Sequence, residues 1–167
     1  ILASWNAHLF EKECVYSDLG FMLLGWILEL VFKTSLDALF QDWLAKPLKL
    51  ESLQFLPTSP DIVPTENCPW RGHVLRGEVH DDNCYVLGGI AGHAGLFGNT
   101  RDVLEMGSVW LNSKKPLQKD LVKKYWSLSH VPQSTRVLGW DSVSTENSAT
   151  GLYFSPSSRG HMGYTGT

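Results

Sequence analysis

The sequence predicts an α/β fold of the α+β kind, in which helices pack against an antiparallel sheet. Helix-like segments come first along the chain, and strand-like segments fill roughly the last forty residues, an order typical of that layered arrangement. The chain has 167 residues, of which 43% are hydrophobic and 19% charged. This length and composition suit one folded domain with a hydrophobic core.

The first predicted helix covers residues 19–32, an apolar run interrupted only by two glycines and one glutamate. Ser17 or Asp18 can cap it, because short polar side chains accept hydrogen bonds from the free N–H groups of a first turn. So apolar a helix is expected to be buried on most sides. The run is shorter than the ~20 residues that span a bilayer, so we expect no membrane-spanning segment here.

Three further helices follow from helical spacing and capping residues. The second begins after Thr34 or Ser35 and ends at Pro47, since proline cannot continue the hydrogen-bond ladder. The third begins after Asn99 or Thr100, and the fourth covers residues 117–126 with its lysines outward. The apolar residues expected to pack inward from the third helix are Val103, Leu104, Met106, Val109, Trp110 and Leu111.

The remaining segments are loops and strands. Residues 51–87 are rich in Pro, Asp, Asn and Thr and predict a long ordered surface loop with one short strand. We call this segment the excursion, and loops of this kind often line a functional site. Residues 88–98 are glycine-rich but lack the Gly-Lys-Ser/Thr of a phosphate-binding loop. Strands are expected at residues 137–140, 152–154 and 160–165.

Charge and cysteine content exclude several classes of protein. A net charge of −3 gives no basic surface for nucleic acid or anionic membrane. Cys14, Cys68 and Cys84 form neither an even disulfide set nor a Cys-x-x-Cys pair for zinc, so we expect free or buried thiols. No cofactor is predicted.

Because the chain opens at Ile1 without a signal peptide and closes inside a strand-like segment, we expect an internal fragment of a longer parent protein.

Three motifs occur in order. YSDLGFMLLGWILE begins at Tyr16, GEVHDDNCYVLGGIAGHAGLFGNTRDVLEMG begins at Gly77, and GHMGYTGT closes the chain. Together they resemble the β-lactamase-related serine hydrolases, which include class C β-lactamases, low-molecular-weight penicillin-binding proteins and family VIII-type esterases. The first resembles the family's Tyr-x-Asn segment, and the last its Lys-Thr-Gly strand in the His-x-Gly form.

The resemblance implies a β-lactamase/transpeptidase-like fold, with residues 1–167 forming a single partial domain. It implies a bacterial hydrolase that acts through an acyl-serine intermediate on a D-alanyl peptide, a β-lactam or an ester. The Ser-x-x-Lys motif that carries the nucleophile does not occur in the chain, so this segment alone is expected to be inactive. One alternative is a non-catalytic binding domain of the same fold, and a second is an unrelated helical interaction domain that uses the seven tryptophans as contact residues. The family favours a periplasmic or cell-envelope location, with the cytoplasm left open, and a small-molecule or peptide substrate.

The resemblance assigns proton transfer to Tyr16. A phenol with a reference pKa of ~10 is mostly protonated at neutral pH, and nearby cations favour the phenolate. Asp18, two residues on, can face the same cleft. The family usually has asparagine there, and a carboxylate cannot donate a hydrogen bond unless it is protonated. Efficient β-lactam turnover is therefore not expected, and a plain helix cap is the other interpretation of Asp18.

His161 stands where the family more often has lysine. It can present a partly charged ring to a substrate carboxylate or hydrogen-bond the tyrosine. Gly163 lets substrate approach the strand closely, and the resemblance makes the backbone N–H of Tyr164 an oxyanion-hole donor. We expect Tyr16, Asp18 and His161 to line one cleft.

A metal site is the competing interpretation of the acidic and histidine residues in the middle motif. His80, Asp81 and Asp82 are adjacent, and His93 follows after a short interval. A metal site also needs converging geometry and supporting hydrogen bonds, which these spacings do not indicate. We therefore predict no metal and a hydrogen-bonded loop scaffold near the active site.

Overall fold

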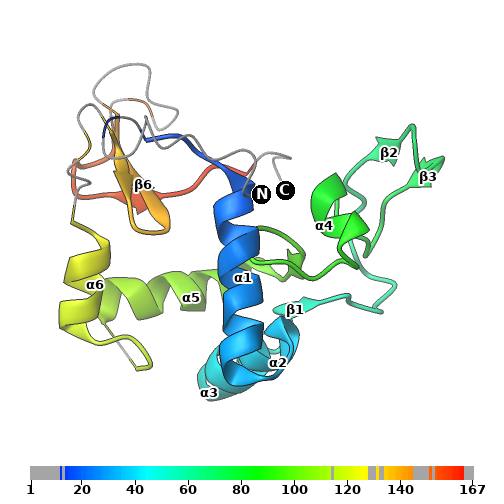
Figure 1. Cartoon of the computed structure of the whole chain (residues 1–167), viewed down its shortest axis with the longest axis horizontal. Helices are drawn as coiled ribbons and strands as arrows, with labels where there is room; N and C mark the ends of the chain where they lie inside the picture. Colours follow the sequence, from blue (N-terminus) through cyan, green and yellow to red (C-terminus); the bar gives the residue numbers. More distant parts are fainter. Residues whose placement is uncertain are drawn as a thin grey trace. The chain divides into compact units, whose positions relative to one another are not determined.

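The computed structural model describes residue 12 and residues 14–113, 115–127, 131, 134–144, 151 and 153–163. Contacts divide the chain into two compact units. One consists of Ile1–Tyr16 with Leu117–Gly166, and the other of Ser17–Pro116 with Thr167. We call them the strand unit and the helical unit. Figure 1 shows the helices and strands of both.

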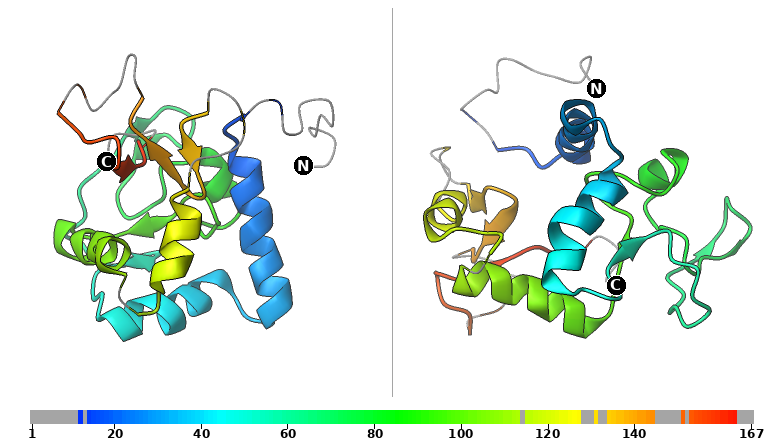
Figure 2. Two further views of the ribbon diagram at one scale, coloured as in Figure 1. Left: turned by 90° about the vertical axis from the view of Figure 1, so that its left-hand side faces the viewer. Right: turned by 90° about the horizontal axis from the view of Figure 1, so that it is seen from below.

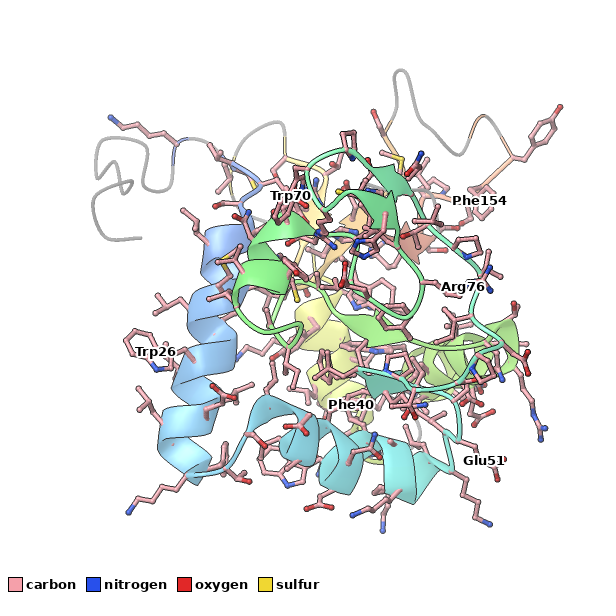
Figure 3. The ribbon with its side chains drawn as sticks, turned by 90° about the vertical axis from the view of Figure 1, so that its right-hand side faces the viewer. Trp26, Phe40, Glu51, Trp70, Arg76 and Phe154 are labelled. Carbon is pink, nitrogen blue, oxygen red and sulfur yellow. The ribbon has the colours of Figure 1, made fainter. Side chains whose placement is uncertain are left out.

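Helix α1 (Asp18–Phe32) opens the helical unit. It starts after Ser17, whose backbone is extended, and ends where Lys33 adopts a left-handed conformation with φ 52°. The start agrees with the sequence, but the predicted burial does not: Gly25 is the buried residue of the helix. Many of its large apolar side chains are exposed, and Trp26 projects away from the helix in Figure 3. Among the described residues, α1 is covered along one narrow side, at Gly25.

The second predicted helix is built from three consecutive pieces. They are α2 (Leu36–Phe40), a π-helical turn η3 (Gln41–Ala45) and α3 (Lys46–Leu48). This composite helix turns by 82° from α1 (Figure 2). Pro47 lies in the first turn of α3, where its missing N–H is tolerated, and the chain leaves the helix at Lys49 in a left-handed conformation.

A small core forms where the composite helix meets the segment that follows it. Ala45, Leu50 and Leu53 are buried together, and partly buried apolar side chains pack against them. Gly98 lies so close to Leu53 that an added Cβ would come within 2.7 Å of that side chain. The partly buried members of this core are Phe40, Leu48 and Met106.

The excursion contains more regular structure than the single strand we predicted. Strand β1 (Gln54–Phe55) pairs antiparallel with β4 (Leu96–Phe97), and β2 (Asn67–Cys68) pairs antiparallel with β3 (His73–Val74). A short helix, α4 (Asp82–Val86), follows. The β1–β4 pairing ties the start of the excursion to the end of the glycine-rich segment.

Arg71 anchors the far part of the excursion. Its side chain is 1% exposed and forms ion pairs with Glu78 at 3.0 Å and Asp82 at 2.8 Å. It also donates to the carbonyl oxygens of residues 79 and 80. The guanidinium lies over the rings of Trp70 and Tyr85, at 4.9 and 4.0 Å from their centroids. One buried cation therefore organises a segment that has little regular structure.

Helix α5 (Thr100–Asn112) closes the helical unit. Asn99 caps it by accepting a hydrogen bond from the Asp102 N–H at 2.9 Å, as the sequence predicted. Asp102 is itself buried, and its carboxylate accepts from the N–H and hydroxyl of Ser52 at 2.6 and 2.7 Å. The predicted inward face is only partly confirmed, since Val109 is buried whereas Val103, Leu104 and Leu111 are exposed.

The strand unit contains helix α6 (Lys119–Tyr125) and a three-stranded antiparallel sheet. The order is β5 (Arg136–Val137), β6 (Trp140–Ser142), β7 (Arg159–Gly160). Residues 137–140, predicted as one strand, form a hairpin instead, because Gly139 turns the chain with φ 74°. The predicted strand at residues 160–165 is also wrong where it can be examined: β7 ends at Gly160, residues 161–163 are irregular, and residues 164–165 lie outside the described part.

In the described residues, no single helix is long and apolar enough to cross a membrane. Helix α1 and the composite helix meet the length and composition criteria only as a bent pair.

Candidate active site

The strand unit brings together two residues that the sequence singled out. Tyr16 lies in irregular chain just before α1, and His161 follows β7. Their ring centroids are 5.7 Å apart, with the planes inclined by 55°. Half of the Tyr16 surface is exposed, so the phenol ring is held by neighbours yet remains open to a reactant.

Arg136 is a third member of this cluster, and the sequence analysis missed it. It lies on β5, and its guanidinium carbon is 4.9 Å from the centroid of the Tyr16 ring. Across the β5–β6 register, its Nη1 lies 3.5 Å from an Asp141 carboxylate oxygen. A lone arginine beginning a short strand carries no motif. The one available signal was chemical, since a tyrosine that moves protons is helped by a nearby cation.

The His161 ring has a defined hydrogen bond. Its Nδ1 lies 2.9 Å from the carbonyl oxygen of Met162. A carbonyl oxygen only accepts, so Nδ1 carries the hydrogen and a neutral ring offers Nε2 as its acceptor. Gly163 follows in irregular backbone. Tyr164, the predicted oxyanion-hole residue, lies outside the described residues.

Asp18 belongs to the helical unit, where it begins α1. There it lies beside Asp81 and His93, with one donor atom of each residue within 4.8 Å of the others. The structure thus joins the first motif to the middle motif at Asp18. The prediction that Asp18 shares a cleft with Tyr16 and His161 concerns both units and stays a prediction.

Asp81 is held firmly at the start of α4. Its Oδ1 accepts the Cys84 N–H at 2.7 Å as the helix cap and lies 2.8 Å from Nε2 of His93. Partial burial alone would raise the pKa of Asp81. The Cys84 N–H and the His93 ring outweigh burial and hold that pKa below its ordinary value. Asp81 is therefore a carboxylate at neutral pH.

Cys84, in α4, is fully buried, and its Sγ lies 3.3 Å from the carbonyl oxygen of Ala94. Burial, followed by the nearby Asp81 charge, raises the pKa of the Cys84 thiol to about 11. A thiol this reluctant to ionise is a packing residue rather than a nucleophile.

His80 and Asp82, the other two residues of the middle motif considered for a metal, have partners of their own. His80 pairs with Glu66 at 3.0 Å, and Asp82 accepts hydrogen bonds from Arg71 and from the Trp70 indole N–H. Of the four residues considered for a metal, only Asp81 and His93 come together.

The side chains best placed to hold a metal ion, among the described residues, are Asp18, Asp81 and His93. Imidazole and carboxylate donors suit a divalent transition metal. Asp81 and His93 already form a direct hydrogen bond, however, and Asp81 also caps a helix. Among the described residues, Nδ1 of His93 is buried without a hydrogen-bond partner, so the scaffold leaves that nitrogen unsatisfied.

Comparison with known proteins decides the family. The family model described as Beta-lactamase matches residues 2–167. The chain belongs to the β-lactamase family. It is 34% identical, over 94% of its length, to a protein of Salmonella gallinarum described as "Putative D-alanyl-D-alanine carboxypeptidase", and 35% identical over 92% to a similarly described protein of Salmonella enteritidis. It spans 42% and 41% of the lengths of these two relatives.

A solved structure supports the fold of this β-lactamase-family chain. The octameric penicillin-binding protein homologue from Pyrococcus abyssi superposes with a TM-score of 0.59 at 17% identity, covering 78% of this chain and 30% of that one. This likeness confirms the predicted β-lactamase/transpeptidase-like fold.

Proposed function

We propose that the chain is part of a serine hydrolase that removes D-alanine from D-alanyl peptides through an acyl-serine intermediate. The observation that carries the proposal is the packing of Tyr16 against His161, with Arg136 over the tyrosine ring. These side chains come from three distant parts of the sequence. Family membership, and relatives described as carboxypeptidases, supply the reaction class.

In the proposed mechanism, the nucleophile is the serine of a Ser-x-x-Lys motif outside these 167 residues. Its oxygen attacks the carbonyl carbon of the penultimate D-alanine, and the peptide C–N bond then breaks to leave an acyl-serine. Tyr16, as the phenolate, takes the serine proton, and the phenol so formed passes that proton to the leaving nitrogen. Water then hydrolyses the ester by the reverse proton path and regenerates the serine.

The other residues assist at the carbonyl and at the substrate carboxylate. His161 presents its ring to the carboxylate of the terminal D-alanine as an imidazolium, because the Nε2 atom of the neutral ring and the carboxylate would both be acceptors. The backbone N–H of Tyr164 stabilises the oxyanion, and Gly163 leaves room for the substrate backbone. Asp18 engages the lysine of the Ser-x-x-Lys motif by charge.

Asp18, in place of the usual asparagine, argues against efficient turnover of a β-lactam. A carboxylate cannot donate a hydrogen bond to a substrate amide carbonyl in the way that the usual asparagine can. A β-lactam is therefore expected to acylate the serine and to be released slowly, which makes it a useful label.

The test uses the parent protein, whose sequence upstream of Ile1 is first read for Ser-x-x-Lys. Fluorescent penicillin should label that serine stoichiometrically, as located by peptide mass spectrometry, and D-alanine should be released from a peptide ending in D-alanyl-D-alanine. Tyr16→Phe should slow acylation by roughly a hundredfold or more, as expected for loss of a general acid–base. Tyr153→Phe is the matched control, because Tyr153 is 97% exposed.

Three outcomes would contradict the proposal. Absence of both labelling and turnover, with a parent that lacks Ser-x-x-Lys, would favour the non-catalytic binding domain. Release of an alcohol from small esters without release of D-alanine would favour an esterase. Equal rates for Tyr16→Phe and Tyr153→Phe would remove Tyr16 from the mechanism.

A further inference from the structure

The geometry points to Asp81 and His93 as a partly buried pair that positions Asp18 for the reaction, an inference that rests on the proposed function. Both residues lie in the middle motif, to which the proposed mechanism assigns no role. Both lie in the helical unit, and both have a donor atom within 4.8 Å of an Asp18 carboxylate oxygen.

Burial and a hydrogen bond hold the His93 ring rigidly. Its side chain is 2% exposed, and its Nε2 lies 2.8 Å from Asp81 Oδ1. Because that oxygen accepts, Nε2 carries the hydrogen and donates it to Asp81. Asp81 is fixed in turn by the Cys84 N–H at the cap of α4. Asp81, at the N-terminus of α4, therefore holds the His93 ring in one orientation.

The glycine-rich segment, residues 88–98, packs closely against the backbone of α1. A Cβ added to Gly92 would overlap the carbonyl oxygen of Phe21, and one added to Gly25 would lie 3.1 Å from the Gly92 N atom. Two glycines thus allow the backbones of the segment and the helix to touch, within about two turns of Asp18. This backbone contact places His93, the next residue, beside the first turn of α1.

Electrostatic repulsion from Asp81 also acts on Asp18. Asp81 is a carboxylate whose charge is fixed by two hydrogen bonds, and a second carboxylate so near is repelled by it. The His93 ring beside them is rigid and buried. An Asp18 carboxylate oxygen lies within 4.8 Å of a donor atom of each residue. Repulsion from Asp81 and the fixed His93 ring therefore limit the rotamers open to Asp18, which is how the pair positions it.

His93→Leu in the parent protein tests the pair. Reaction of a D-alanyl-D-alanine peptide is followed, and kcat is normalised to active sites titrated with fluorescent penicillin. We expect kcat to fall tenfold to a hundredfold, roughly the cost of a 1 Å misplacement of a reacting group, with KM changed by less than about threefold. His93→Gln, whose amide can still donate to Asp81, should recover most of the loss. His80→Leu is the matched control, since His80 pairs with Glu66 in the same excursion.

A double-mutant cycle separates positioning from general support of the fold. If the pair acts through Asp18, His93→Leu should cost less than about twofold when Asp18 is already alanine. A second double-mutant cycle combines Asp81→Asn with Asp18→Ala. The Asp81→Asn variant is expected to fold, because asparagine also caps helices well. Additive losses in both cycles, or an unchanged kcat for His93→Leu, would overturn the inference.

Two further outcomes are distinguishable from these. If activity is lost on dialysis against EDTA and restored by Zn²⁺ or Mg²⁺, the three side chains bind a metal and the positioning role is wrong. If the parent protein is not acylated and releases no D-alanine, the proposed function fails and this inference fails with it. An active parent with unaffected His93 variants overturns the inference alone.

Discussion

At the scale of single residues, Tyr16 is held from two sides in the strand unit. His161 meets its ring at an inclined angle, and the Arg136 guanidinium lies over its face. A cation over an exposed aromatic ring is worth about 0.5–1 kcal/mol and restricts the ring as well. Arg136 therefore supports the one side chain on which the proposed proton transfer depends.

The first prediction concerns Arg136. Arg136→Gln removes the cation, so the rate of acylation of the parent protein by fluorescent penicillin should fall about twofold to fivefold, the equivalent of ~0.5–1 kcal/mol. Arg136→Lys retains the charge and should lose less. Arg76→Gln is the control, since Arg76 lies in the helical unit and donates to the Ile62 carbonyl oxygen. Unchanged rates in Arg136→Gln would show that the contact has no kinetic role.

The second prediction concerns Asp102. Hydrogen bonds from the N–H and hydroxyl of Ser52 hold the pKa of Asp102 below its ordinary value of 3.8. A carboxyl group whose pKa is lower in the folded than in the unfolded state stabilises the fold at any pH above its unfolded-state pKa. That stability is lost as the pH falls through the folded-state pKa. The Tm difference between the parent protein and its Asp102→Asn variant should therefore be largest above about pH 5 and shrink towards pH 3.

Melting curves across that range check this prediction. Asp42→Asn is the control, because Asp42 forms an exposed i,i+4 ion pair with Lys46 and such pairs contribute little. A Tm difference between the parent protein and Asp102→Asn that does not vary with pH would mean that the Asp102 charge is not coupled to folding.

At the scale of elements, capping and spacing predicted the helices well, because both are local. Asn99 caps α5 as the sequence indicated, and α1 starts after Ser17, although the Ser17 side chain makes no capping hydrogen bond. Strands were predicted less well. The hairpin at Gly139 and the pairings of β1 and β2 depend on distant partners, which residue patterns in one short segment do not identify.

The same distinction applies to the site. Motif resemblance identified Tyr16 and His161, which the structure places together. Arg136 and the packing of Asp18 beside His93 arise only from tertiary contacts, so no local signal could have indicated them. The separation of the four residues considered for a metal also depends on tertiary contacts, since His80 and Asp82 have partners within the excursion.

The third prediction compares two glycines of α1. A Cβ at Gly25 would lie 3.1–3.2 Å from Gly92 backbone atoms, whereas one at Gly20 meets nothing within 4 Å in this chain. Gly20→Ala should therefore stabilise the parent protein by about 0.5–1 kcal/mol, the usual gain in a helix. Gly25→Ala should be destabilising despite the same gain in helix propensity. Urea unfolding measures both, and equal effects would argue against the close contact of α1 with the glycine-rich segment.

At the scale of the whole molecule, the described chain presents much apolar surface. On α1 alone, Leu24, Trp26, Leu30 and Val31 are all more than half exposed. The chain spans less than half the length of the curated relatives it matches. Taken together, these facts suit a segment whose apolar faces are covered by further parts of a longer domain.

The fourth prediction concerns the chemistry of the isolated chain. Because no Ser-x-x-Lys occurs in the sequence, residues 1–167 alone should not be acylated by fluorescent penicillin. Gel fluorescence and intact-mass measurement check this, with the active parent protein as the positive control. Stoichiometric labelling at a serine of this chain, for example Ser17, would overturn the roles assigned to Tyr16 and His161.

The last prediction concerns the stability of the isolated chain. Buried apolar surface contributes ~25 cal/mol per Å², so a chain that leaves most of α1 and the outer side of α5 uncovered forgoes much of the main favourable term in folding. Its contacts also divide into two units, and the described strands are two or three residues long. Such short strands with open edges add little cooperativity and invite association.

We therefore expect residues 1–167 to melt over a broad, weakly cooperative range and to bind a dye that reports exposed apolar surface. Calorimetry and dye fluorescence measure the two properties, and the parent protein, with α1 covered, should melt sharply and bind little dye. A sharp two-state transition of a monomeric 167-residue chain would mean that the exposed faces of α1 and α5 need no further cover. The segment would then be a complete domain, and the non-catalytic binding function would become the better explanation for the missing serine.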